Sequence, residues 1–88
     1  PDAPLGSIRD QTRRVLTSLR EVLEAAGSGL DRLLQVTVYV TDLGSWGQVN
    51  EVFAEFLGDH RPARAVVPVL PLKRNAGLEL MAVAAVRE

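Results

Sequence analysis

The chain has 88 residues, a formal net charge of −1 at pH 7, 47% hydrophobic residues and only 5% aromatic ones. At this length about 60–65% of the unfolded chain's surface becomes buried, so we expect a single domain over residues 1–88 with a modest core of Val, Leu and Ala. The scattered basic residues exclude the positive patch of a nucleic-acid-binding protein, and the lack of cysteine excludes disulfides, thiolate nucleophiles and cysteine-bound zinc.

A helix is predicted over residues 8–26. Ser7 precedes it and Asp10 follows three residues later, a spacing typical of a capping box. Hydrophobic residues then recur at helical spacing: Ile8, Val15, Leu19, Val22 and Leu23. The glycines at 27 and 29 predict the end of this helix, because glycine accepts the left-handed conformation that closes many helices.

A strand and a shorter helix are predicted next. Alternation of apolar with more polar residues over 34–41 predicts a strand with one apolar face, made of Leu34, Val36, Val38 and Val40. Ser45 and Gln48 predict a second capping box. An apolar stripe then predicts a helix that ends near Gly58: Val49, Val52, Phe53, Phe56 and Leu57.

Two more strands are predicted in the C-terminal part. Residues 65–70 form an apolar run in which Pro68, lacking an N–H donor, indicates a sheet edge or a bulge. After a turn at 73–77, the run 78–86 is largely apolar on both faces, although one face carries Glu79. Two helices cover only one face of a small sheet, so we expect self-association to cover the other, with Glu79 on that face or at its margin.

Arg64 and Glu79 are the first candidates for chemistry, because a charged side chain in apolar surroundings must be paired, solvated or kept for a ligand. Arg64 closes the segment Arg-Pro-Ala-Arg at 61–64, and its guanidinium suits a substrate carboxylate. Glu79 suits the orientation or deprotonation of a water molecule. Alternatives remain open: Arg64 as a surface residue or half of an intersubunit salt bridge, and Glu79 as a solvated residue or the structural partner of Arg64.

Other polar and aromatic residues carry weaker signals. Asn50, early in the second helix, either caps that helix or points its amide into a cleft. His60 stands in a polar loop, where we expect it to be solvated, and one histidine alone does not form a metal site. Trp46 and Tyr39 are expected to be packing residues, and Phe53 a core residue.

The location of the protein follows from composition alone. No apolar run reaches the roughly 18 residues needed to span a bilayer, and no signal peptide is evident. A small domain without disulfides suits a reducing compartment, so we expect a cytoplasmic protein.

Six segments together resemble a known family: QTRRVL at 11–16, LEAAG at 23–27, VTVYVTDL at 36–43, VNEVF at 49–53, PAR at 62–64 and LELMAVA at 78–84. Their sequences and order are similar to those of the Rid family of reactive enamine/imine deaminases, also known as YjgF-type or endoribonuclease L-PSP proteins. The resemblance covers about residues 6–87. It implies an α+β, chorismate-mutase-like fold in the order helix-strand-helix-strand-strand, with two helices packed on one face of a sheet.

The resemblance also implies an assembly and a reaction. The assembly is a homotrimer with three clefts between subunits, and the reaction is hydrolysis of 2-imino or enamine acids to 2-keto acids and ammonia, without a metal or organic cofactor. In such a site Arg64 grips the substrate carboxylate and Glu79 positions the attacking water. Backbone groups near Val66 complete the pocket, and Asn50 is a further candidate for substrate binding.

The chain departs from the family pattern in three places. Family members carry a further N-terminal β-hairpin that contributes a tyrosine and a serine to the cleft, and nothing in this sequence matches it. If the hairpin is absent from the protein, rather than cleaved or outside this sequence, we expect an exposed sheet edge prone to association and weakened activity. Met81 stands where many members have a second glutamate, and the loop before Pro62 is shorter than usual, two differences that affect substrate preference.

Two hypotheses about function follow. The first is a 2-iminobutanoate/2-iminopropanoate deaminase-like hydrolase that acts on small molecules and has no nucleic-acid or membrane partner. The alternative is a non-catalytic or regulatory Rid-like protein that binds small carboxylates through Arg64. A ribonuclease ranks last, because the sequence shows neither a pair of histidines for acid–base catalysis nor a basic groove.

Overall fold

The chain folds into two helices and three strands in a computed structural model that describes residues 6–86. The elements are α1 Ile8–Ala25, β1 Leu33–Val40, α2 Trp46–Leu57, β2 Ala63–Pro68 and β3 Leu78–Ala84. Short 3-10 turns precede β1, α2 and β3 at η1 Leu30–Arg32, η2 Leu43–Ser45 and η3 Lys73–Asn75. This order confirms the predicted α+β class.

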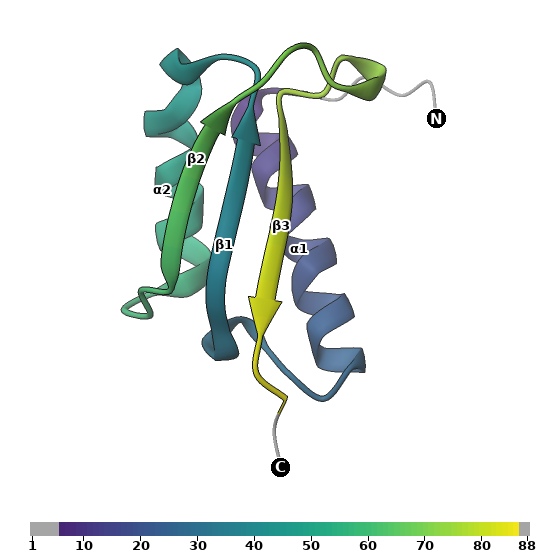
Figure 1. Cartoon of the computed structure of the whole chain (residues 1–88), viewed down its shortest axis with the longest axis vertical. Coiled ribbons are helices and arrows are strands. Elements are labelled where there is room, and N and C mark those ends of the chain that lie inside the picture. Colours follow the sequence, from purple (N-terminus) through teal and green to yellow (C-terminus); the bar gives the residue numbers. More distant parts are fainter. Residues whose placement is uncertain (1–5, 87–88) are drawn as a thin grey trace.

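β1 is the central strand of a mixed sheet with the strand order β2-β1-β3. It runs parallel to β2 and antiparallel to β3, and α2 forms the connection that a parallel pair requires. Both helices lie on the same face of the sheet, α2 behind β2 and α1 behind β3 (Figure 1). In the described part of the chain, no helix covers the opposite face.

The hydrophobic core fills the space between the sheet and the helices. Val36, Val38 and Val40 point from β1 toward the helices and are completely buried. The remaining buried hydrophobic residues come from both helices and the strand ends: Leu16, Leu33, Val49, Val52, Phe53 and Leu78. Burial of each such side chain contributes about 1.5–3 kcal/mol, so this single layer supplies most of the stabilisation.

Three details differ from the sequence-based prediction. Leu34 is 56% exposed, because a register shift between Leu33 and Gln35 gives Leu33 the buried position instead. Ser45 makes no capping bond; its hydroxyl donates to the carbonyl of Asp42 at 2.7 Å, and the Asp42 carboxylate accepts from the N–H of Gly44. β2 begins two residues earlier than predicted, at Ala63, because its pairing with β1 already starts there.

Other local predictions are confirmed. The hydroxyl of Ser7 caps α1 by accepting from the N–H of Asp10 at 3.1 Å. At the other end of α1, Gly27 adopts a φ of 79°, and the N–H of Ser28 donates to the carbonyl of Leu23 at 2.7 Å, which is the Schellman closure. Pro68 lies on an edge strand, where its missing N–H costs no sheet hydrogen bond.

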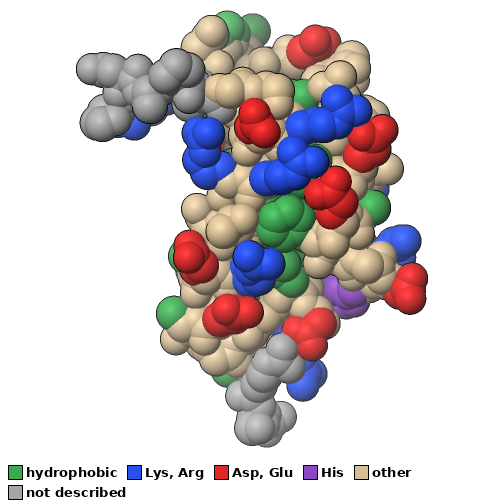
Figure 2. Space-filling model, turned by 180° about the vertical axis from the view of Figure 1, so that it is seen from behind, with side chains coloured by type: hydrophobic (Ala, Val, Ile, Leu, Met, Phe, Trp, Pro, Cys, Tyr) green, Lys and Arg blue, Asp and Glu red, His purple; other side chains and the backbone are tan. Residues whose placement is uncertain are grey.

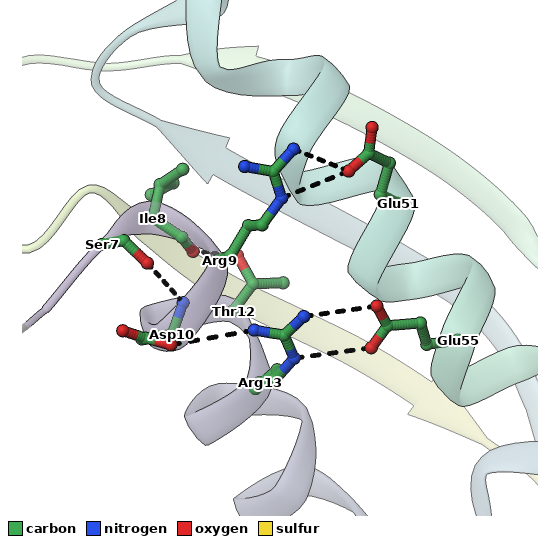
Figure 3. Close-up of polar contacts among 8 residues, drawn as sticks. All are labelled: Ser7, Ile8, Arg9, Asp10, Thr12, Arg13, Glu51 and Glu55. Carbon is green, nitrogen blue, oxygen red and sulfur yellow. Dashed lines mark hydrogen bonds and ion pairs between the residues drawn. The ribbon is translucent and has the colours of Figure 1, made fainter.

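Ion pairs join the outer surfaces of the two helices. Arg9 meets Glu51 at 2.8 Å and Arg13 meets Glu55 at 3.3 Å, while Asp10 lies beside Arg13 (Figure 3). On the helix-covered side of the molecule, acidic and basic side chains are interspersed with exposed hydrophobic ones (Figure 2). Each of these exposed pairs contributes only about 0–1 kcal/mol, so they adjust the helix packing that the core already determines.

Two glycine substitutions should have opposite effects on stability. In Gly27→Ala an added Cβ makes only ordinary contact with Val86, at 3.6 Å, so the cost of about 1 kcal/mol comes from the positive φ. Gly47 lies in α2 with open space around it, so Gly47→Ala should stabilise the protein by up to about 0.5 kcal/mol. Thermal unfolding followed by circular dichroism measures both changes. Unchanged or raised stability in Gly27→Ala would contradict the helix ending described here, and a loss in Gly47→Ala would contradict the open space around Gly47.

Candidate functional site

A cleft of about 340 Å³ lies between α2, the edge strand β2 and the loop 58–62 that joins them. α2 contributes residues spaced three and four apart, which share one face of a helix. The apolar part of the lining consists of Val36, Phe53, Ala54, Leu57 and Pro62. The polar part consists of Asn50, His60, Arg61 and Arg64. The arrangement combines an apolar wall with two cations, an amide and an imidazole.

The register of the sheet determines where the side chain of Arg64 lies. Arg64 is the partner of Val36 in the parallel pairing of β1 with β2. Side chains of paired residues lie on the same face of a sheet, and Val36 is buried against the helices. Arg64 therefore belongs to the helix side, next to α2, rather than to the open face.

The guanidinium of Arg64 is held by three residues of α2. One of its terminal nitrogens, Nη2, donates to the side-chain oxygen of Asn50 at 2.8 Å. Its central carbon lies 4.9 Å from the ring centre of Trp46 and 5.4 Å from that of Phe53, within the range of cation–π attraction. Burial lowers the pKa of Arg64, and the nearby charge of Arg61 lowers it further, yet arginine stays charged at neutral pH.

Neither arginine of the cleft has a carboxylate partner among residues 6–86. Arg61 donates from its Nη1 to the carbonyls of Gly58 and His60, and its other guanidinium nitrogens make no hydrogen bond within the described chain. Arg9 and Arg13 on the helix surface, in contrast, are both paired with glutamates. The cleft thus holds two positive charges that the described residues leave uncompensated.

His60 is not solvated as the sequence suggested. It is partly buried, and its Nε2 lies 2.8 Å from the carbonyl oxygen of Leu33. Because a carbonyl only accepts, this nitrogen carries the proton and donates. The contact ties the loop 58–62 to the start of β1 and so fixes the mouth of the cleft.

The outer edge of β2 offers backbone groups beside Arg64. The N–H of Val69 donates to the carbonyl of Val40 at 2.9 Å, and the pairing register extends this pattern back along the strand. Backbone groups alternate in direction along a strand, so those of Ala65 and Val67 face β1, while those of Arg64 and Val66 face outward. Val66 does not line the cleft itself; its outward N–H and C=O lie along the neighbouring edge.

Glu79 lies on the other side of the sheet. It is exposed and pairs with Tyr39 on β1, whose neighbours Val38 and Val40 point toward the helices. Glu79 and Arg64 therefore stand on opposite faces and on opposite edge strands, β3 and β2. Within one chain, Glu79 is not the structural partner of Arg64, and the structure does not bring the two predicted catalytic residues together.

Sequence reasoning assigned Trp46 and Phe53 to packing and missed their contact with Arg64. Phe53 is indeed buried, with 1% of its surface exposed, but its ring also faces the guanidinium. A usable signal was present, because Trp46, Asn50 and Phe53 recur at i, i+4 and i+7 on one helix face. The spacing alone did not indicate that β2 would lie beside that face.

Two structural features bear on other classes of function. Within residues 6–86, no three His, Cys, Asp or Glu side chains gather in an arrangement that would hold a metal ion. Neither helix of the described chain has the length and apolar character needed to cross a membrane.

The match to a family is extensive. The family model described as Endoribonuclease L-PSP matches residues 3–86. The chain belongs to this family. The six segments that resemble Rid/YjgF sequences therefore reflect true membership.

Individual family members resemble the chain over nearly its whole length. A RutC family protein from Pyrococcus horikoshii is 43% identical over 79 residues, which make up 90% of this chain and 63% of the relative. Protein HMF1 of Saccharomyces cerevisiae is 37% identical over 90 residues, covering 100% of this chain and 70% of its own length. The chain thus spans a little under two thirds of the archaeal protein.

Solved structures of the family share the fold. A Thermotoga maritima protein superimposes with a TM-score of 0.90 at 42% identity, over 99% of this chain and 68% of its own. Escherichia coli TdcF, solved with bound serine, gives a TM-score of 0.88 at 32% identity, over 99% of this chain and 69% of its own. Both similarities confirm the Rid/YjgF-type fold.

The stacking of Arg64 on Trp46 should be visible in fluorescence, because Trp46 is the only tryptophan. We expect Arg64→Met to shift the emission of Trp46 and to make it more accessible to acrylamide. Arg20→Met is the matched control, since Arg20 stacks on Phe56 instead. Equal spectra and quenching for Arg64→Met and the unmodified protein would contradict the contact.

Proposed function

We propose that this protein hydrolyses reactive 2-imino and enamine acids to 2-keto acids and ammonia, as a single Rid-like domain acting on small molecules. The observation that carries the proposal is the state of Arg64: its guanidinium is fixed by Asn50 and two aromatic rings, but no carboxylate of residues 6–86 neutralises it. A fixed, unpaired guanidinium suits the carboxylate of such a substrate. The outward backbone groups of Arg64 and Val66 offer further donors and acceptors.

The reaction needs little from the protein beyond positioning. The carbon of a C=N bond is already electrophilic, so water adds to it as the nitrogen takes up a proton. The resulting tetrahedral adduct then breaks its C–N bond, which releases ammonia and leaves the 2-keto acid. Holding the carboxylate and one water in contact distance supplies most of what such a step requires. In this proposal Arg64 holds the carboxylate and Glu79 orients the water and accepts its proton.

The separation of Arg64 and Glu79 leads to a proposal about assembly. If the two act on one substrate, they must come from different copies of the chain, because they lie on opposite faces of one sheet. The open face that carries Glu79 also exposes Met81, Val83 and Val67, at 54%, 52% and 37%. These apolar side chains favour burial against a second copy. We therefore propose the homotrimer that the family resemblance implies, with its sites between subunits.

Two further observations support the small-molecule assignment. The cleft volume lies near the small end of the range of about 300–1,000 Å³ typical of ligand pockets. TdcF was solved with serine, which carries the α-carboxylate that Arg64 would bind here.

A cytoplasmic location remains part of the proposal, although one relative in Schizosaccharomyces pombe is named mitochondrial.

The decisive test follows the loss of 2-iminobutanoate, generated by an amino-acid oxidase and trapped with semicarbazide. We expect the protein to accelerate its disappearance. Arg64→Ala should reduce kcat/KM about 100-fold through the lost carboxylate contacts, and Glu79→Gln should reduce kcat about 100-fold with less effect on KM. Arg20→Ala, with its arginine on the surface of α1, is the control and should retain the full rate.

The same assay separates the two hypotheses about function. Acceleration that vanishes with Arg64 or Glu79 supports the deaminase. A folded protein that binds 2-oxobutanoate through Arg64 but does not accelerate the loss of the imine would rule out the deaminase hypothesis. That result would favour the hypothesis of a non-catalytic protein that binds small carboxylates.

The assembly proposal has its own test. Met81→Lys places a charge on the open apolar face, so we expect it to dissociate the assembly to smaller species in light scattering. Val22→Lys is the matched control, because Val22 is 65% exposed but lies on α1. A monomer before any substitution would rule out the role proposed for the open face.

A further inference from the structure

The cleft contains a second guanidinium that the proposed reaction leaves without a role. Arg61 lines the same cleft as Arg64. Its Nη1 is occupied by the carbonyls of Gly58 and His60, at the C-terminal end of α2, where a positive charge is favourable. Its Nε and Nη2 have no hydrogen-bond partner in the described chain. Capping of α2 therefore accounts for one nitrogen of Arg61 and leaves the others available.

Two neighbouring cations in one cleft repel each other and favour an anionic ligand. Arginine side chains are charged at neutral pH. Burial lowers the pKa of Arg64, and the charge of Arg61 lowers it further. A ligand with a single carboxylate compensates only one of them. A ligand with two carboxylates compensates both, which makes charge a means of selecting the substrate.

The rest of the lining restricts the remainder of the ligand. Ala54, Leu57 and Pro62 form the accessible part of the apolar lining, against which a short chain of methylene groups can lie. A volume of about 340 Å³ suits a metabolite of a few carbons rather than a nucleotide or a peptide.

We infer that this cleft selects dicarboxylates: its preferred substrate is a 2-imino acid whose side chain ends in a second carboxylate, such as the imine of glutamate. Arg64 binds the carboxylate next to the imine, and Arg61 binds the one at the end of the side chain. The imine chemistry rests on the proposed function, whereas the preference for two carboxylates rests on the cleft alone. Arg61 is then the residue that determines specificity.

The test is a binding measurement that needs no turnover. Isothermal titration compares 2-oxoglutarate with 2-oxopentanoate, which has the same number of carbons but lacks the second carboxylate. We expect 2-oxoglutarate to bind about tenfold more tightly, the effect of one charge-assisted contact. Arg61→Gln should remove most of this preference, and Arg61→Lys should restore part of it. Arg20→Gln, outside the cleft, should leave the preference unchanged.

Each other outcome contradicts the inference. The unmodified protein could bind the two keto acids with equal affinity, or Arg61→Gln could weaken the binding of both by the same factor. Either result would mean that the two arginines share one carboxylate. Failure of both keto acids to bind would also overturn it. The result can be told apart from that of the deaminase proposal. If the protein prefers 2-oxoglutarate but does not accelerate the loss of imines, the dicarboxylate site stands and the deaminase reaction is ruled out. If the protein accelerates the loss of 2-iminobutanoate but binds both keto acids equally, the reaction stands and the dicarboxylate preference is ruled out.

Discussion

The alternation of side chains along β1 is the constraint on which the rest of the structure depends. Val36, Val38 and Val40 are buried against both helices, so this strand cannot slip by one residue without turning its apolar side to water. Because β1 is the central strand, its register also decides the faces of its neighbours. It places Arg64 on the helix side through β2 and Glu79 on the open side through β3.

Helix α2 links the core to the cleft. Val49 and Val52 are completely buried, while Trp46 and Asn50 on the same helix contact Arg64. Phe53 does both, since it is buried and its ring faces the guanidinium. The orientation of Arg64 is thus a by-product of core packing: the residues that dock α2 onto the sheet also fix the cation. A site built this way needs few residues of its own, because residues of the helix that packs the core also hold the cation.

Local sequence signals predicted local structure well. The capping by Ser7, the helix ending at Gly27 and the edge position of Pro68 each depend on a few neighbouring residues, and all were confirmed. One failure is local, since the hydroxyl of Ser45 bonds the carbonyl of Asp42 instead of capping α2. Two others involve contacts between distant segments. The bulge that exposes Leu34 depends on β3, and the hydrogen bond of His60 depends on the start of β1. Arg64 was identified from its motif, but the residues of α2 that hold its guanidinium were not. The sequence of residues 46–53 does not indicate which strand will lie beside them.

Pro68 also limits how the outer edge of β2 can pair with a strand of another molecule. A strand added to the edge of β2 would form a ladder with outward N–H and C=O groups at every second residue. Arg64 and Val66 offer both groups, but at the next outward position Pro68 has no N–H to give. A small ligand needs no more than two such residues, whereas a growing fibril needs an unbroken row. The edge therefore keeps the two residues that the proposed ligand needs, while Pro68 interrupts amyloid-like stacking of one molecule on another.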